Sequence, residues 1–338
     1  MVPSPTAEDI RSAYRLLLGR EPENETVVEN WHRLGSFDQL REAFLASSEF
    51  MGMRPGAPGA TLVPLEAPPI DVEWQTDAAN GAALLAHVRA VWTRLGTERP
   101  HWSVLSAERF QPENISESTR EFYASGAQDT AMLVACLKRH GLAPAQFPRM
   151  FEFGCGVGRV TPFMARAFRQ VTACDVSASH MDMARGVVKG AGLDNITLNL
   201  VQGAEFGMTG PFDLWFSRLV LQHNPPPVMA MILRRAFSML APGGVAAFQV
   251  PTYAIGYRFA IAPYLQGMSN AGGIEMHVLP QSMVLKIAAE YGCLPLEIWQ
   301  DGAAGNAAAW VSNTFLFRKQ AAIATANFSL GTSFRTGG

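Results

Sequence analysis

A glycine-rich turn after an apolar run is the segment most able to do chemistry. Residues 149–153 are typical of a strand, and Gly154, Gly156 and Gly158 follow at alternate positions before a helical stretch. Glycines permit a tight turn and let a ligand approach the main chain, because no Cβ stands in the way. The third glycine comes one residue earlier than in a dinucleotide-binding turn, and the acid in the strand, Glu152, suits a cation better than a pyrophosphate. The turn therefore predicts a site for a cationic ligand.

A carboxylate after the next apolar run extends this prediction. Asp175 follows the run 171–174 and comes seventeen residues after Gly158, a distance at which an acid accepts hydrogen bonds from both hydroxyls of a ribose. Two other readings stay open: a turn that only packs tightly, and an Asp175 that only caps the following helix. The two features together favour a cationic nucleoside.

The elements that must position these residues form an alternating pattern. Short apolar runs separated by helical stretches predict an α/β fold with a mostly parallel sheet covered on both faces. The boundaries we expect are a helical module over 1–52, a Pro/Gly-rich linker over 53–70, a helical lid region over 71–147, the sheet domain over 148–320 and a flexible tail over 321–338. The strands we expect cover 149–153, 171–175, 197–201, 212–217, 244–250, 294–300 and 311–317.

Composition excludes several classes of function. The chain has 338 residues, 17% of them charged, with a net charge of −2 and no block of Lys and Arg, so we expect no nucleic-acid partner. Its four cysteines, Cys136, Cys155, Cys174 and Cys293, form no Cys-x-x-Cys pair, and no His, Cys, Asp or Glu set has the spacing of metal ligands. The first residues do not resemble a signal peptide and no apolar stretch is long enough to span a bilayer. We therefore expect a cytoplasmic protein without a metal or a membrane span.

The segment from about Arg149 to Lys319 resembles a class I S-adenosylmethionine-dependent methyltransferase. The glycine turn matches the first motif of that family, Asp175 its ribose acid, residues 212–215 its fourth strand and residues 240–244 the turn into its fifth. The resemblance implies a Rossmann-like sheet of seven strands and S-adenosylmethionine as the cofactor. The implied cofactor contacts are Glu152, Gly154, Gly156, Gly158, Arg159, Asp175, Val176 against the adenine, Arg218 after the fourth strand and Tyr123 in the lid.

One position departs from the family pattern. Gly203 stands where the family commonly has an acid for the adenine amino group. Gln202, Glu205 or a backbone group takes that contact in our prediction.

The acceptor is expected beyond the carboxyl ends of the strands. Transfer of a methyl group to a hydroxyl needs a base, and His223, in the loop after the fourth strand, is our first candidate. Glu275 and His277, which follow the fifth strand, are the next candidates. An architectural role for His223 stays open, as does core or lid packing for the aromatic residues near Glu275.

Residues 13–50 resemble a small bacterial helical domain of unknown function that often accompanies glycan-related or secreted proteins. Leu18-Gly19-Arg20, Trp31 and the pattern Ser47-x-Glu49-Phe50 carry that resemblance. We expect this module to bind a protein partner. It also favours a saccharide or polysaccharide precursor as the acceptor, and hence a role in polysaccharide biosynthesis. The alternatives are N- or C-methylation of a small metabolite, and a non-catalytic scaffold that binds S-adenosylmethionine.

Overall fold

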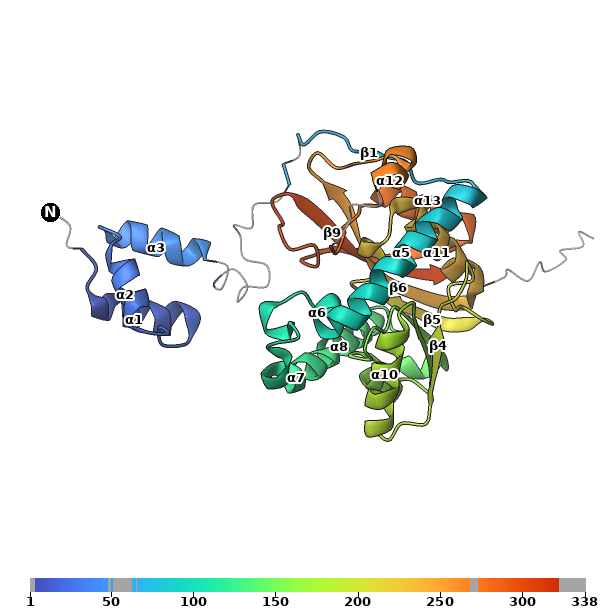
Figure 1. Ribbon diagram of the computed structural model, residues 1–338, viewed down its shortest axis with the longest axis horizontal. Helices are drawn as coiled ribbons and strands as arrows, with labels where there is room; N and C mark the ends of the chain where they lie inside the picture. Colours follow the sequence, from blue (N-terminus) through green and yellow to red (C-terminus); the bar gives the residue numbers. More distant parts are fainter. Residues whose placement is uncertain (1–3, 48–49, 51–62, 65, 268–272, 322–338) are drawn as a thin grey trace, which may run out of the picture. The chain divides into compact units, whose positions relative to one another are not determined.

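The computed structural model describes residues 4–47, 50, 63–64, 66–267 and 273–321. It divides the chain into two compact units, Met1–Pro64 and Leu65–Gly338, which are coloured along the sequence in Figure 1. Most of the predicted linker over 53–70 lies outside the described residues, and so does the predicted tail beyond residue 321.

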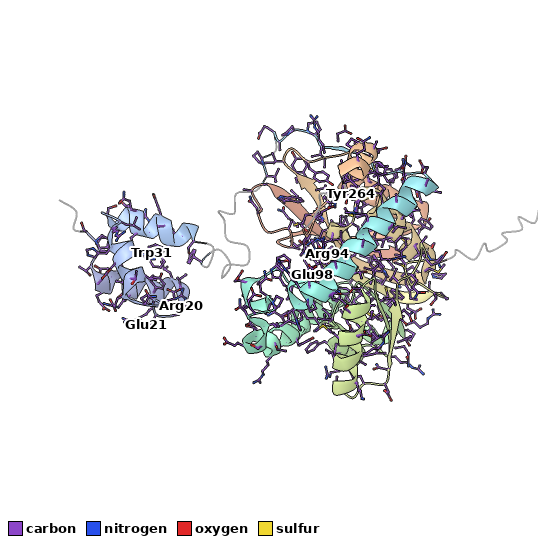
Figure 2. The ribbon with its side chains drawn as sticks, viewed as in Figure 1. Arg20, Glu21, Trp31, Arg94, Glu98 and Tyr264 are labelled. Carbon is purple, nitrogen blue, oxygen red and sulfur yellow. The ribbon has the colours of Figure 1, made fainter. Side chains whose placement is uncertain are left out.

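The first unit is helical. Each of the three α-helices whose bounds the structure gives in this unit begins at a polar residue whose side chain accepts a hydrogen bond from the first turn, as N-cap residues do. Tyr14, Trp31 and Phe44 pack at its centre, with the Trp31 and Phe44 rings stacked 4.2 Å apart. Trp31 is labelled in Figure 2. The elements are α1 (Ala7–Ala13), a π-helical turn (Tyr14–Leu18), α2 (Glu25–His32) and α3 (Phe37–Ala46).

The second unit is built on a seven-stranded sheet in the order β4-β3-β2-β5-β6-β9-β8. The first five of these strands run parallel, and β9 is antiparallel to both β6 and β8. The predicted α/β, Rossmann-like fold and its seven strands are thereby confirmed. The strands are β2 (Arg149–Phe153), β3 (Gln170–Asp175), β4 (Ile196–Leu200), β5 (Phe212–Ser217), β6 (Leu240–Ala254), β8 (Cys293–Asp301) and β9 (Trp310–Lys319).

Two hydrophobic layers cover the sheet. Because successive side chains of a strand point to opposite faces, Trp215 of β5 packs in one layer and its neighbours Leu214 and Phe216 pack in the other. Helices α11 and α13 contribute to the first layer, and α8 and α9 contribute to the second. A central sheet covered in this way leaves the carboxyl ends of its parallel strands for a ligand.

The long helix α5 runs obliquely across the second unit, in cyan in Figure 1. Strand β1 (Asp71–Val72) precedes it in the chain and pairs in parallel with β7 (Arg258–Phe259), which joins the lid region to the segment after β6. The helices of this unit are α5 (Ala78–Glu98), α6 (Pro100–Val104), α7 (Ile115–Ala124), α8 (Gly126–Arg139), α9 (Thr161–Ala167), α10 (Ala178–Gly190), α11 (Pro226–Met239), α12 (Ile261–Gly267) and α13 (Gln281–Glu290). Among the described residues, no helix is both long and apolar enough to cross a membrane.

Candidate active site

A cavity opens at the carboxyl ends of β2, β3 and β5. Its floor is the glycine turn, and α5 and α6 wall it from the other side. The space between these elements is about 1090 Å³ when the open solvent at its mouth is counted.

The glycine turn brings its backbone to the cavity because two of its residues adopt conformations that side chains resist. Gly154 and Gly156 have φ of +77° and +54°. A Cβ on Gly156 would lie 2.7 Å from a methyl carbon of Val104, and one on Gly154 would lie 2.4 Å from Val220. Gly158 is not among the cavity-lining residues and instead packs against Ala184 of α10. The first two glycines shape the floor, and the third seats a helix.

Asp175 lies at the end of β3 and lines the cavity. One of its carboxylate oxygens accepts a hydrogen bond from the backbone N–H of Gly156 at 3.0 Å. The other accepts one from the N–H of Ser177 at 2.9 Å. Because a carboxylate has about four lone-pair sites, each oxygen keeps capacity for a ligand hydroxyl. This placement agrees with a ribose-binding role. The N-cap of the following helix α10 is instead Ser177, whose side chain accepts from the His180 N–H.

Glu152 is buried at the floor of the cavity. Its side chain is 3% exposed, and its Oε2 has no hydrogen-bond partner among the described residues. Burial raises the pKa of this carboxyl to about 7, against the opposing positive charge of Arg159. A cationic group bound in the cavity would satisfy the unpaired oxygen and stabilise its charged form.

Asp129 of α8 joins two cavity arginines. Arg159, which follows the glycine turn, places Nη2 2.5 Å from one carboxylate oxygen of Asp129. Arg218, just after β5, places Nε 2.8 Å from the other oxygen. This triplet has one negative and two positive charges, and it fastens the lid region to the ends of β2 and β5.

The wall formed by α5 is a stripe at helical spacing. Leu85, Val88, Arg89 and Trp92 all line the cavity, as expected for positions three and four residues apart. Leu85, Val88 and the indole of Trp92 make the wall apolar. The exposed Arg89 side chain makes no hydrogen bond or ion pair with any other residue that the structure describes.

Four predicted cofactor contacts do not line the cavity, namely Gly158, Gln202, Glu205 and Tyr123, whereas Val176 does. Gln202 and Glu205 are exposed, and Glu205 forms an ion pair with Arg235. Val201 and Gly203, on either side of Gln202, do line the cavity. A backbone group therefore remains as the candidate for the adenine contact. Tyr123 is held by a hydrogen bond between its hydroxyl and His101 Nε2 at 3.2 Å and does not line the cavity.

His223 also lies outside the cavity, in the loop after β5. Its Nδ1 donates to the Glu275 carbonyl at 2.8 Å. Its Nε2 accepts from the Gln222 amide at 3.1 Å, because the Gln222 carbonyl oxygen already accepts from Gln249. Burial lowers the pKa of His223 to about 4. With both ring nitrogens engaged, this histidine fastens two loops together, which is the architectural alternative that the sequence left open.

Glu275 and His277 form a second polar cluster, separate from the cavity. The carboxylate accepts hydrogen bonds from His277 Nε2 at 2.9 Å and from the Tyr264 hydroxyl at 2.6 Å, and Tyr264 is labelled in Figure 2. His277 Nδ1 is 2.9 Å from the hydroxyl of Tyr257. Despite burial, the hydrogen bonds from His277 and Tyr264 hold the pKa of Glu275 down at about 2. Neither Glu275 nor His277 lines the large cavity, so the expected acceptor residues are tied to one another.

Sequence reasoning missed Asp129, Ser103 and His180. The sequence does contain a sign of the role of Asp129, because this acid lies on the same helical face as the apolar Leu133 and Cys136. A carboxylate buried on that face needs a charged or hydrogen-bonding partner. Ser103 and His180 meet through tertiary contacts alone.

Comparison with known proteins identifies the domain around this cavity. Residues 150–244 match the family model described as a methyltransferase domain. This part of the chain is similar to methyltransferase domains. Trans-aconitate 2-methyltransferase of Deinococcus radiodurans is 33% identical to it over 106 residues, which cover 31% of this chain and 38% of that protein. A ubiquinone biosynthesis O-methyltransferase of Caulobacter sp. strain K31 is 27% identical over 178 residues, which cover 51% of this chain and 62% of that protein.

The structure of magnesium protoporphyrin IX methyltransferase from Synechocystis PCC 6803, with bound S-adenosylhomocysteine, superimposes with a TM-score of 0.50 at 16% identity. The match covers 70% of this chain and all of that one, and it shows a shared fold. The chain spans about two-fifths of the length of the trans-aconitate methyltransferases that it matches. The family model covers residues 150–244, so α5 and the segment after β6 lie outside it.

Proposed function

We propose that this protein is an S-adenosylmethionine-dependent methyltransferase. The observation that carries the proposal is the cavity itself, where a glycine turn, a ribose-type carboxylate and an unpaired buried acid meet at the carboxyl ends of parallel strands. Names of the matching relatives add support, since both are methyltransferases.

The cavity residues fit this cofactor. Asp175 would accept hydrogen bonds from the ribose hydroxyls, and Val176 would pack on the adenine. Glu152 offers a buried carboxylate oxygen to a cationic group. When bound, S-adenosylmethionine supplies an electrophilic methyl group. The chain's own contribution is alignment and exclusion of water by the α5 wall, which is the main requirement of an in-line displacement.

The acceptor that the cavity supports best is a small organic molecule with an anionic group. The α5 stripe supplies an apolar surface and places the unpaired Arg89 guanidinium at the mouth of the cavity. The other two arginines that line the cavity are already paired with Asp129. A carboxylate or phosphate on the acceptor would find its charge-assisted partner in Arg89.

A saccharide hydroxyl is the second candidate. It rests on the N-terminal unit, whose residues resemble a module found beside glycan-related proteins, and that unit would then act by binding a partner. The acceptors named for the matching relatives are not saccharides.

Two experiments test the proposal. Titration calorimetry on the full chain should give binding of S-adenosylhomocysteine and none of NAD, and binding of NAD alone would overturn the proposal. Radiolabelled S-adenosylmethionine is then incubated with trans-aconitate, catechol carboxylates, primary amines and nucleotide sugars. Label on an organic acid supports the first acceptor class, and label on a nucleotide sugar supports the second.

A variant pair tests the role of Arg89. With a labelled acid as the acceptor, Arg89→Gln should raise KM about ten-fold or more and leave kcat nearly unchanged. Its effect should vanish with the uncharged methyl ester of the same acid. Arg94→Gln is the matched control, because Arg94 is an exposed residue of the same helix (Figure 2) but does not line the cavity. Equal effects of both variants would show a general surface-charge effect.

A further inference from the structure

A buried histidine connects the lid helices to the ribose-type carboxylate. His180 of α10 is 1% exposed. Its Nδ1 lies 3.4 Å from an Asp175 oxygen, and its Nε2 lies 3.0 Å from Ser103 Oγ. Ser103 belongs to α6, and all three residues line the cavity. Three separate elements therefore meet in one chain of contacts beside the floor of the site.

The contact with Asp175 fixes the roles of the two ring nitrogens. A carboxylate oxygen only accepts hydrogen bonds, so the hydrogen between His180 and Asp175 is on Nδ1. With Nδ1 as the donor, Nε2 accepts from the Ser103 hydroxyl, which also lies 2.9 Å from the Pro100 carbonyl. Nδ1 is therefore directed at Asp175 and Nε2 at the lid.

Close packing holds the ring in this position. A Cβ on Gly96 of α5 would lie 2.1 Å from Ser177 Oγ and 3.1 Å from a ring carbon of His180. The next residue, Thr97, shares a hydrogen bond of 3.0 Å with Ser179. The end of α5 is thus pressed onto the start of α10, so the imidazole has little room to leave Asp175.

We propose that His180 is a positioning residue that couples the α5–α6 lid to Asp175. Ser103 and His180 fix the carboxylate in the orientation that receives the ribose hydroxyls. A carboxylate that is already ordered loses less conformational freedom when the ligand binds. The inference rests on the proposed cofactor and adds two residues that the family motifs do not contain.

Two substitutions at His180 separate its two contacts. His180→Asn keeps an amide near the position of Nδ1, hence the contact with Asp175, and loses Ser103. His180→Gln keeps an amide near the position of Nε2, hence the contact with Ser103, and loses Asp175. Ser103→Ala removes the lid contact alone. Ser106→Ala is the control, because Ser106 is exposed and lies outside the cavity.

The readout is titration calorimetry of the full chain with S-adenosylhomocysteine and with its 2′,3′-dideoxy analogue. For the natural ligand, we expect Kd to rise about ten-fold in His180→Gln and about three-fold in His180→Asn and Ser103→Ala. Each increase should shrink to less than about two-fold for the analogue, since the residues act through the two ribose hydroxyls that it lacks. Thermal melts identify any variant that fails to fold, and Ser103→Ala removes only one hydroxyl.

The outcomes separate this inference from the proposed function. If the parent protein binds no S-adenosylhomocysteine, both fail. If the parent binds it and all variants bind as the parent does, the inference alone is wrong. Equal losses for the two ligands would also overturn it, because they indicate general packing damage.

Discussion

Replacing His223 tests whether folding keeps this imidazole uncharged. Burial lowers its pKa from 6.5 to about 4, so between these pH values the unfolded chain binds a proton that the folded chain does not. Stability must therefore fall as pH drops through this interval. The difference corresponds to about 3 kcal/mol in total, of which about 2 kcal/mol falls between pH 7 and pH 5.

His223→Asn removes the titration but keeps an amide donor near the Glu275 carbonyl. The Gln222 amide loses its acceptor, so at pH 7 the variant should be less stable by about 1–2 kcal/mol. At pH 5 the two proteins should have nearly equal stability, because the parent alone has lost its protonation-dependent part. Urea unfolding at a series of pH values measures this. The difference in urea midpoint between parent and variant should narrow by about 1 M from pH 7 to pH 5. The N-terminal unit is identical in both proteins, so its unfolding cancels.

Parallel pH curves for the two proteins would refute the reasoning. A second refutation would come from kinetics. His223 does not line the cavity, so S-adenosylhomocysteine affinity and methyl transfer should stay within about three-fold of the parent. A fall in turnover on the order of 10² or more with unchanged stability would instead support a catalytic base.

Three further predictions concern the floor of the cavity and the helices packed around it. Asp175→Asn should raise Kd for S-adenosylhomocysteine at least about ten-fold by calorimetry, since it weakens charge-assisted hydrogen bonds to the ribose; an unchanged Kd would mean that Asp175 only holds the local turn at Gly156 and Ser177. Burial raises the pKa of Glu152 to about 7, so the folded chain retains a proton that the unfolded chain loses from about pH 4.5, and stability falls as pH rises to 7. Glu152→Gln should therefore melt higher than the parent at pH 8 and not at pH 4.5, and equal melting temperatures at pH 8 would contradict this. Gly126→Ala places a Cβ 2.1 Å from the Arg159 carbonyl oxygen, so the free energy of unfolding in urea should fall by about 1–3 kcal/mol. Gly186→Ala lies in open space on α10 and should raise that free energy by up to about 1 kcal/mol. An unchanged stability of Gly126→Ala would show that the backbone around Arg159 shifts to make room.

Much of the fold follows from local patterns. The apolar runs that predict strands are short and flanked by polar or glycine residues, so each strand of the large sheet lies where its run does. Gly154, Gly156 and Asp175 follow two consecutive strands, and this order is enough to bring them together, because neighbouring parallel strands end at the same edge of the sheet. Whether a residue follows the end of a strand depends only on the local sequence, so it can be predicted without the tertiary structure.

The surroundings of the cavity depend on contacts between distant segments. Asp129 meets Arg159 and Arg218 across 30 and 89 residues, and His180 meets Ser103 across 77. No local periodicity in the sequence predicts that these distant residues come into contact, because the contacts depend on where the lid helices pack on the sheet.

His223 shows the same limit for chemistry. The residue type and its place after a strand are those of a base, and both are visible in the sequence. Whether its nitrogens face a ligand or two neighbouring loops depends on the side-chain orientation and on where Gln222 and the Glu275 carbonyl come to lie. Residue type and chain order determine the sheet and the strand ends at which the glycine turn and Asp175 lie. The hydrogen-bond partners of each polar group are determined only when the whole unit packs, because a buried donor or acceptor must be satisfied by the groups that the fold places beside it.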